Sequence, residues 1–239
     1  TLRMWDPIVP ALATDHLVIR FDTRGFGSTT FDDVPYSDRA DALAVLDHLG
    51  VERATVIGGS RGGGIALDLA VEHPSRVNGV VVIGSGPSGF PALELTDREN
   101  ELVDSIDAAE TAGDWEKVAD LENILWNVGP TRTENDVDPG FLRSARELGR
   151  ANVRHGAGAG RAIGLEPPAY GQVDGLPVPA LVIVGGFDVS VALAHYDFLV
   201  STIPKATGVR FPDAAHLPSL EQPVEFLRVL REWLEKTGL

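Results

Sequence analysis

Apolar residues in this chain gather into five short, nearly continuous runs, each closed by glycine, proline or a polar turn. The runs are rich in Val, Ile and Leu rather than alternating with polar residues. Strands that are apolar on both faces are typical of a parallel sheet covered by helices on either side. We therefore predict five buried strands. They lie at 17–21, 54–58, 77–83, 180–184 and 208–211.

Helical patterns separate these runs, so the chain predicts an α/β fold with a mostly parallel, doubly wound sheet. Ser37 or Asp38 can cap a helix that stops at Gly50, and proline ends the helix before Pro74. Pro223 opens an amphipathic helix that continues through Trp233. The other core helices are expected at 4–13, 61–73 and 191–203.

The alternation stops between residues 87 and 170, where the pattern predicts helices at 97–112, 114–126 and 138–154, each opened by Asp. We expect a core formed by residues 1–86 and 171–239, with 87–170 as an inserted helical cap over the site. The glycine-rich stretch 154–164 has few packing side chains. It predicts either a mobile segment or a small-residue helix packed closely on a neighbour.

Composition narrows the classes of function. The 239 residues carry a formal charge of −15 without a Lys/Arg cluster, which argues against a nucleic-acid or anionic-membrane partner. The chain has no cysteine, which excludes disulfides, thiolate metal sites and a cysteine nucleophile. No apolar run has the length of a membrane span and no signal peptide opens the chain, so we expect a cytoplasmic protein. No metal or organic cofactor is implied.

The strongest chemical signal is the run Gly58-Gly59-Ser60-Arg61-Gly62, which joins a predicted strand to a predicted helix. A serine at so sharp a turn needs flanking glycines, because side chains there would keep the helix away from the strand. Its hydroxyl would stand clear of the sheet, near the backbone N–H of Arg61, which is placed to stabilise an oxyanion. The alternative is a glycine-rich turn with an incidental serine.

A serine nucleophile needs a general base that an acid orients. Asp188 and His216 follow the two last predicted strands, and the carboxyl ends of parallel strands meet at one edge of the sheet. Asp22 also ends a predicted strand, but the order serine, acid, histidine favours Asp188. The pair Gly25-x-Gly27 follows a predicted strand, as in a dinucleotide-binding loop. It lacks the third glycine and the following helix of such a loop, so the sequence does not favour nucleotide binding.

Four motifs stand out: Gly58-x-Ser60-x-Gly62, Asp22-x-Arg24-Gly25-x-Gly27, Val184-Gly-Gly-Phe-Asp188 and Ala215-His216-Leu-Pro-x-Leu-Glu221-x-Pro223. Together they resemble the α/β-hydrolase fold superfamily, and most closely its capped esterases, enol-lactonase-like lactonases and C–C hydrolases. The resemblance implies Ser60 as nucleophile, His216 as base, Asp188 as orienting acid, Arg61 N–H as an oxyanion donor, and an acyl-enzyme.

The sequence departs from that family at its start. The family has two or three further strands before Met4, and the third ends in a loop that donates the second oxyanion N–H. In the family's sheet that third strand lies between the strands that correspond to 17–21 and 54–58, so its absence leaves two open edges in the middle of the sheet. We expect that an N-terminal piece has been removed from this chain, or that a separate fragment or a homo-oligomer completes the sheet. Otherwise we expect weak activity, because the loss of one oxyanion donor costs about 3 to 4 kcal/mol of transition-state stabilisation.

Three aromatic residues and two arginines are candidates for contacts with the substrate. Trp126 resembles a cap tryptophan that faces the substrate, although such residues often belong to the cap core, and Phe26 and Phe90 are candidate wall residues. Arg61 and Arg132 are candidates to meet a substrate carboxylate. Three functions remain: hydrolysis of small carboxylic esters or lactones, C–C cleavage of ring-fission diketones, and a non-catalytic binding protein with this fold.

Overall fold

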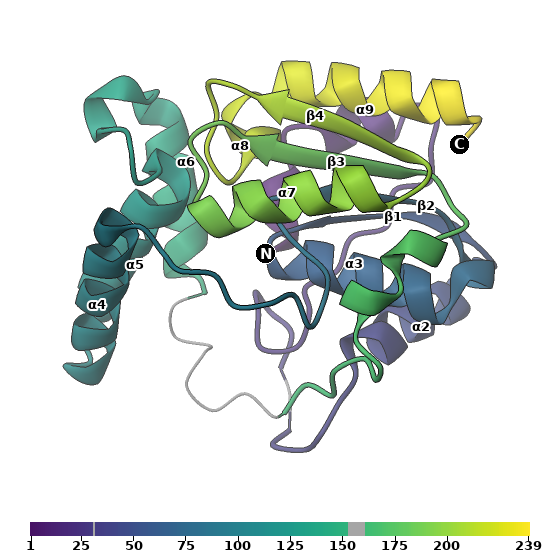
Figure 1. Cartoon of the computed structure of the whole chain (residues 1–239), viewed down its shortest axis with the longest axis horizontal. Helices are drawn as coiled ribbons and strands as arrows, with labels where there is room; N and C mark the ends of the chain where they lie inside the picture. Colours follow the sequence, from purple (N-terminus) through teal and green to yellow (C-terminus); the bar gives the residue numbers. More distant parts are fainter. Residues whose placement is uncertain (31, 153–160) are drawn as a thin grey trace.

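A parallel sheet of four strands with helices on both faces forms the centre of the protein (Figure 1). The computed structural model describes residues 1–30, 32–152 and 161–239. The strands lie side by side in chain order, and all neighbouring pairs are parallel. They are β1 (Ala54–Gly59), β2 (Val77–Ile83), β3 (Ala180–Gly185) and β4 (Ala206–Phe211). Four of the five predicted strands are thereby confirmed.

The register brings the carboxyl ends of the strands into one row. Gly59 pairs with Ile83, Ile83 with Ile183, and Gly185 with Phe211. The turns that follow β1, β2, β3 and β4 therefore open at the same edge of the sheet, where ligands bind in open α/β sheets.

The segment 17–21, which we predicted as a strand, does not join the sheet. A cavity of about 820 Å³ lies between it and β1, which is an edge strand of the sheet. Leu17 is 78% exposed and Phe21 39% exposed. The prediction was wrong because an apolar run becomes a strand only where its N–H and C=O groups find a ladder partner, and these residues have none among the described strands.

Alternate side chains of the inner strands serve the two faces of the sheet. The helices that cover these faces or follow the sheet are α1 (Val9–Leu12), α2 (Asp38–His48), α3 (Arg61–Glu72), α7 (Ser190–Thr202), α8 (Pro218–Glu221) and α9 (Pro223–Thr237). Val80 and Val82 of β2 pack into a core with α2, α3 and α7. Val81 and Ile83 face the opposite way and pack against α1 and α9. This two-sided burial explains why the sequence of β2 is a continuous apolar run.

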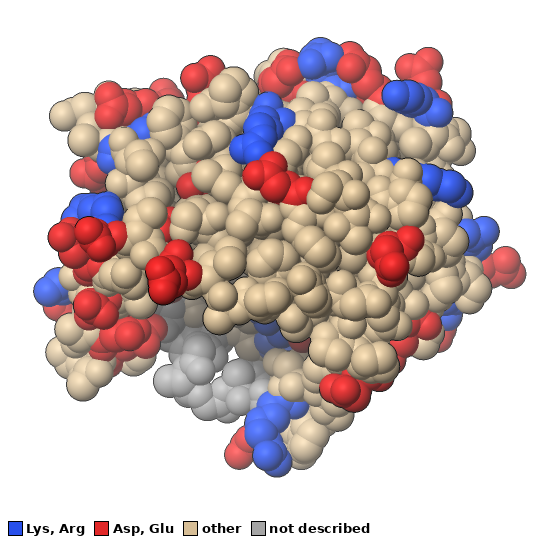
Figure 2. All heavy atoms as spheres, in the orientation of Figure 1, with Lys and Arg blue, Asp and Glu red and all other residues tan. Residues whose placement is uncertain are grey.

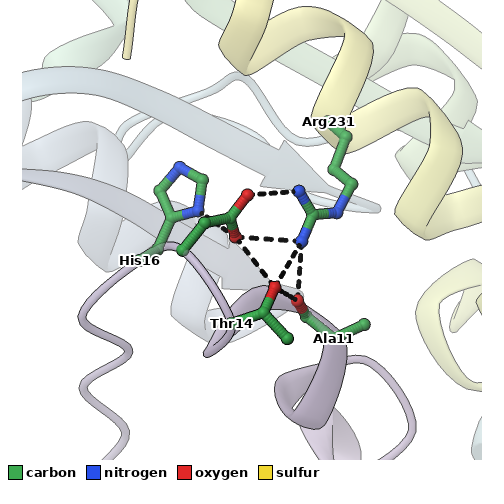
Figure 3. Close-up of polar contacts among 5 residues, drawn as sticks. Ala11, Thr14, His16 and Arg231 are labelled. Carbon is green, nitrogen blue, oxygen red and sulfur yellow. Dashed lines mark hydrogen bonds and ion pairs between the residues drawn. The ribbon is translucent and has the colours of Figure 1, made fainter.

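Polar contacts of Arg231 fasten the N-terminal turn to α9 (Figure 3). Its guanidinium donates to the Ala11 carbonyl at 2.6 Å and to the two carboxylate oxygens of Asp15 at 2.7 and 3.0 Å. The ring nitrogen Nδ1 of His16 lies 2.9 Å from the same carboxylate. The ion pair of Arg231 with Asp15 is exposed, so it positions the turn more than it stabilises the protein.

A helical segment between β2 and β3 lies beyond the carboxyl ends of the strands (Figure 1). The predicted helix 114–126 divides there into an α-helix and a π-helical turn. Thr96, rather than an Asp, caps α4 (Asp97–Thr111). The predicted helix 138–154 ends earlier, because α6 (Pro139–Arg150) stops at Arg150 and residues 151–152 form a turn. Residues 153–154 of that prediction and residues 154–160 of the glycine-rich stretch lie outside the described residues. The elements are α4 (Asp97–Thr111), α5 (Trp115–Glu122), η3 (Asn123–Val128), η4 (Glu134–Asp136) and α6 (Pro139–Arg150).

On the face shown in Figure 2, basic side chains stand singly or beside acidic ones, and other residues cover the centre of that face. Among the helices of the described ranges, none combines the length and the apolar character that a membrane span requires.

Candidate active site

Ser60 occupies the turn between β1 and α3 in a strained backbone conformation. Its φ is 52° and its ψ is −127°, in a region that side-chain-bearing residues rarely adopt. The Ser60 N–H donates to the Ile83 carbonyl at 2.8 Å, and the Ser60 carbonyl accepts from Gly63 N–H at 2.8 Å. Such strain, of the order of 1 to 3 kcal/mol, persists where surrounding contacts hold it, and it is concentrated at functional sites.

Two glycines allow this turn to close. A Cβ on Gly58 would lie 2.0 Å from the Gly62 carbonyl oxygen, and one on Gly63 would lie 2.7 Å from Cβ of Ser85. Neither position has room for a side chain, so the glycines let α3 begin directly after the serine. The N–H groups in the first turn of a helix have no intrahelical acceptor, and the Arg61 N–H belongs to this set.

Asp188 and His216 form a buried pair at the same edge of the sheet. The Nδ1 atom of His216 lies 2.8 and 3.0 Å from the two carboxylate oxygens of Asp188. Asp188 is 4% exposed and His216 5% exposed. Val189 N–H donates to Asp188 at 2.8 Å and fixes the carboxylate further. With Nδ1–H donating to the carboxylate, Nε2 is the free acceptor of the neutral imidazole.

Two further glycines bring this pair against the sheet, and sequence reasoning did not single them out as functional. Gly84 has φ 54°, and a Cβ there would lie 2.9 Å from both Asp188 Oδ2 and His216 Nδ1. A Cβ on Gly185 would lie 1.9 Å from the Ala215 carbonyl oxygen. Both glycines directly follow or end a buried strand, which is the signal that identifies such close approaches.

The imidazole of His216 faces a cavity that Ser60 also lines. Its Nε2 atom is buried and has no hydrogen-bond partner in the described part of the chain. The His216 N–H donates to the carbonyl of Trp126 at 3.1 Å, and the indole lies against the imidazole with 4.8 Å between ring centroids. Both Ser60 and His216 contact the cavity of about 460 Å³, as does Trp126. Ser60, His216 and Trp126, all predicted from the sequence as site residues, therefore line the same cavity.

A buried ion pair, which the sequence did not reveal, holds the loop that carries His216. Arg132 donates to Glu221 at 3.0 Å, and their side chains are 6% and 8% exposed. Arg132 also donates to the carbonyl of Asp213 at 2.9 Å, while Glu221 accepts from Ala215 N–H at 2.8 Å. Arg132 comes from the helical segment, so this pair fixes the loop relative to that segment. Its guanidinium is engaged there, 4.6 Å above the ring centroid of Phe187.

Glu99 ties the start of α4 to the start of α7 beside the cavity. Its carboxylate accepts from the N–H and hydroxyl of Ser190 at 2.5 and 2.7 Å and from the N–H and hydroxyl of Thr96 at 2.8 Å each. Burial alone would raise the pKa of the Glu99 carboxyl, but these hydrogen bonds outweigh it and the pKa lies below its usual value. The group is therefore an anion in the cavity wall.

The remaining predicted residues lie around this centre. Phe26 is stacked under the Arg61 guanidinium, 5.1 Å from it, and lines the larger cavity together with Ser60. Phe90 stands behind the wall, with its ring 4.5 Å from that of His195, so it contacts a lining residue instead of the cavity itself. Asp22 accepts from Leu2 N–H at 2.6 Å, away from His216.

Known proteins resemble this chain in sequence and in fold. A sequence model of the alpha/beta hydrolase fold family matches residues 1–223. The chain is 28% identical over 238 residues to 3-oxoadipate enol-lactonase 2 of Acinetobacter baylyi, covering 94% of this chain and 81% of the relative. It is 30% identical over 235 residues to the 2-hydroxymuconate semialdehyde hydrolase of a Pseudomonas species, covering 96% and 80%. The enol-lactonase of Burkholderia xenovorans LB400 superposes with a TM-score of 0.73 at 27% identity, covering 98% of this chain and 86% of that one.

The chain therefore belongs to the alpha/beta hydrolase fold family. It is a hydrolase of the type that includes esterases and lactonases, because its relatives include enol-lactonases, a methyl ester esterase and 2-hydroxymuconate semialdehyde hydrolases. The family and fold class predicted from the motifs are confirmed.

Proposed function

We propose that this protein hydrolyses small carboxylic esters or lactones through an acyl-enzyme formed on Ser60. The observation that carries the proposal is the buried pair of Asp188 and His216, whose free Nε2 faces the cavity that Ser60 lines. A carboxylate that fixes Nδ1–H leaves Nε2 ready to take a proton from a hydroxyl.

The reaction has two balanced halves. In the first, Nε2 of His216 takes the Ser60 proton as Oγ bonds to the substrate carbonyl carbon, and the oxyanion forms near the Arg61 N–H. The C–O bond then breaks and the alkoxide leaves with the proton from His216. In the second, water gives a proton to Nε2 of His216 as its oxygen bonds to the acyl carbon. The bond from the acyl carbon to Oγ then breaks, Oγ takes the proton from His216, and the carboxylic acid leaves. Asp188 orients the imidazole and stabilises its cationic form.

We assign the region 87–170 as a cap over this site, with residues 1–86 and 171–239 as the core. Two contacts support this assignment. The Trp126 indole lies against the His216 ring, and the ion pair of Arg132 and Glu221 joins the helical segment to the loop of His216. Trp126 is then a substrate-facing residue in the wall of the cavity, and Phe26 flanks the nucleophile on its other side.

A second candidate is hydrolysis of a carbon–carbon bond in a ring-fission diketone. It is favoured by the 30% identity to a 2-hydroxymuconate semialdehyde hydrolase. The same three side chains serve both reactions, so turnover must separate them. We would compare p-nitrophenyl acetate, an enol-lactone and a ring-fission product side by side, and we expect the esters or lactones to be turned over faster.

Labelling with a fluorophosphonate tests the catalytic proposal directly. We expect one adduct, located on Ser60 by peptide mass spectrometry, and none in Ser60→Ala. Ser201, on α7, serves as a matched control, because its hydroxyl bonds only to carbonyls of its own helix among the described contacts. Ser201→Ala should label like the parent protein. Folded protein that takes up no label at Ser60 would favour the non-catalytic alternative.

A further inference from the structure

The cavity beside Ser60 has a largely apolar wall that includes one carboxylate. Apolar side chains line it from α4, η3 and the start of α7, among them Val103, Leu125, Val189 and Ala192. The charged group that faces this wall from α4 is the Glu99 carboxylate, whose oxygens are occupied by the donors of Ser190 and Thr96. An anionic group entering the cavity would thus meet apolar surface and a like charge.

Within residues 1–30, 32–152 and 161–239, the two arginines that are candidates for a substrate carboxylate are already engaged. Arg61 lines it, but its guanidinium donates to Asp38 at 2.7 Å and to Thr23 at 2.8 Å, toward α2. Arg132 is bound to Glu221 and to backbone carbonyls. Neither guanidinium is therefore available to a substrate carboxylate without breaking an existing ion pair.

His195 does not supply a cation either. It lines the cavity, with its ring edge-on to Phe90. Burial lowers the pKa of His195, and the charge of Asp188 offsets only part of that effect. The imidazole is then neutral at pH 7 and contributes a hydrogen-bonding group without charge.

We propose that the substrate arm bound in this cavity is uncharged and apolar, so that the enzyme acts on neutral esters or lactones in preference to those bearing a carboxylate on that arm. This inference rests on the proposed ester or lactone hydrolysis. Its physical basis is that a carboxylate buried without a counter-charge loses its hydration and gains nothing in return. Repulsion from Glu99 adds to that cost.

Two matched pairs of substrates test the proposal in the full chain. The first is p-nitrophenyl hexanoate and mono-p-nitrophenyl adipate, in which a terminal methyl is replaced by a carboxylate on the acyl side. The second is hexyl acetate and 6-acetoxyhexanoate, which places the same change on the alcohol side. We expect kcat/KM to favour the neutral member by about 100-fold in at least one pair, as expected for an unpaired buried charge.

A charge introduced into the wall should reverse part of this preference. Leu95 lines the cavity and is half-buried, whereas Leu93 is 41% exposed and does not line it. Leu95→Arg is expected to reduce the discrimination at least about tenfold by raising kcat/KM for the carboxylate member. Leu93→Arg adds the same charge outside the cavity and should keep the discrimination of the parent protein.

The outcomes separate this inference from the function on which it rests. If both members of each pair are hydrolysed with kcat/KM values within threefold, or the carboxylate member is preferred, the inference is overturned and ester hydrolysis stands. If neither pair is hydrolysed and no fluorophosphonate adduct forms on Ser60, the proposed function itself fails. If Leu95→Arg retains activity but its ratio of kcat/KM for the neutral and the carboxylate substrate equals that of the parent protein, the placement of the substrate arm is also contradicted.

Discussion

The carboxyl edge of the sheet and the helical segment 97–150 border the same cavity, but they are held in place by different forces. At the sheet edge, ladder hydrogen bonds and glycine-permitted backbone contacts place Ser60, Asp188 and His216. The helical segment is joined to that edge by side-chain contacts, notably those of Glu99 and Arg132. Backbone contacts leave little freedom, whereas a side-chain contact can be removed by one substitution.

This difference suggests a division of roles. The proposed proton-transfer group sits on turns whose geometry follows from strand register, so its precision does not depend on the helical segment alone. The apolar wall of the cavity comes largely from α4, η3 and α7, where side chains can change without disturbing the ladder. We expect catalytic substitutions to abolish turnover with little effect on stability, and substitutions in the ties to change stability and turnover together.

The largest effect is expected for Ser60→Ala. Removing the nucleophile should lower kcat by about 10⁴- to 10⁶-fold, while the free energy of unfolding changes by less than about 0.5 kcal/mol because the alanine keeps the same backbone strain. Steady-state kinetics and urea unfolding measure the two quantities. If kcat of Ser60→Ala is within tenfold of that of the parent protein, Ser60 at the sheet edge is not the nucleophile.

Glu221→Gln should affect both regions. It leaves the Arg132 guanidinium buried without its counter-charge, which typically costs about 3 to 5 kcal/mol of stability. The loop before His216 is then less firmly held, and we expect kcat to fall by about 10- to 100-fold through misplacement of the imidazole. Glu225→Gln, which breaks an exposed pair with Arg228, is the matched control.

Measurements below the unfolding transition, in variants shown to be folded by circular dichroism, separate the two effects of Glu221→Gln. If kcat of the folded protein is unchanged while the melting temperature falls, the pair stabilises the fold but does not position His216.

Glu99→Ala tests the tie between α4 and α7. The N–H groups of Ser190 and Thr96 lose their acceptor, and we expect a loss of about 2 to 4 kcal/mol. Because the pKa of Glu99 is lowered in the folded protein, its contribution is present above the ordinary value of 4.5 and is lost as pH falls through the lowered value. The stability difference between parent and variant should therefore shrink in acid.

Chemical denaturation at pH 7 and at successively lower pH measures this difference. Glu101→Gln, on the exposed side of the same helix, should cost less than about 0.5 kcal/mol at pH 7. A pH-independent difference for Glu99→Ala would show that the carboxylate charge is not what holds the two helices together.

The smallest effect is expected for Arg231→Ala, on the side of the molecule shown in Figure 3. Hydrogen bonds from Arg231 and then from His16 lower the pKa of Asp15. Its stabilising contribution is present above pH 3.8 and is lost as pH falls through the lowered pKa, so any decrease in Tm should appear at pH 7 and not in strong acid. Added salt should make this decrease in Tm smaller, because it screens the exposed ion pair of Arg231 and Asp15. No change in activity is expected.

Much of the fold follows from local pattern. The strands β1 to β4 were predicted within about two residues, because apolar runs bounded by glycine and proline leave few other choices. Ser60 was identifiable from the glycines around it, and Asp188 and His216 from their positions after strands. The failure at 17–21 is instructive, since its residues are as apolar as those of β4 but lack a neighbour to pair with.

The sequence by itself determined the α/β class, the strained turn at Ser60 and the approach of Asp188 and His216, because these depend on residue type, strand order and backbone sterics. Only the tertiary structure decided which charges are available. Arg61 and Arg132 are both cations in the sequence, but Asp38 and Glu221 occupy them after folding. Partner choice among charges depends on distances between residues far apart in the chain, which no local pattern contains.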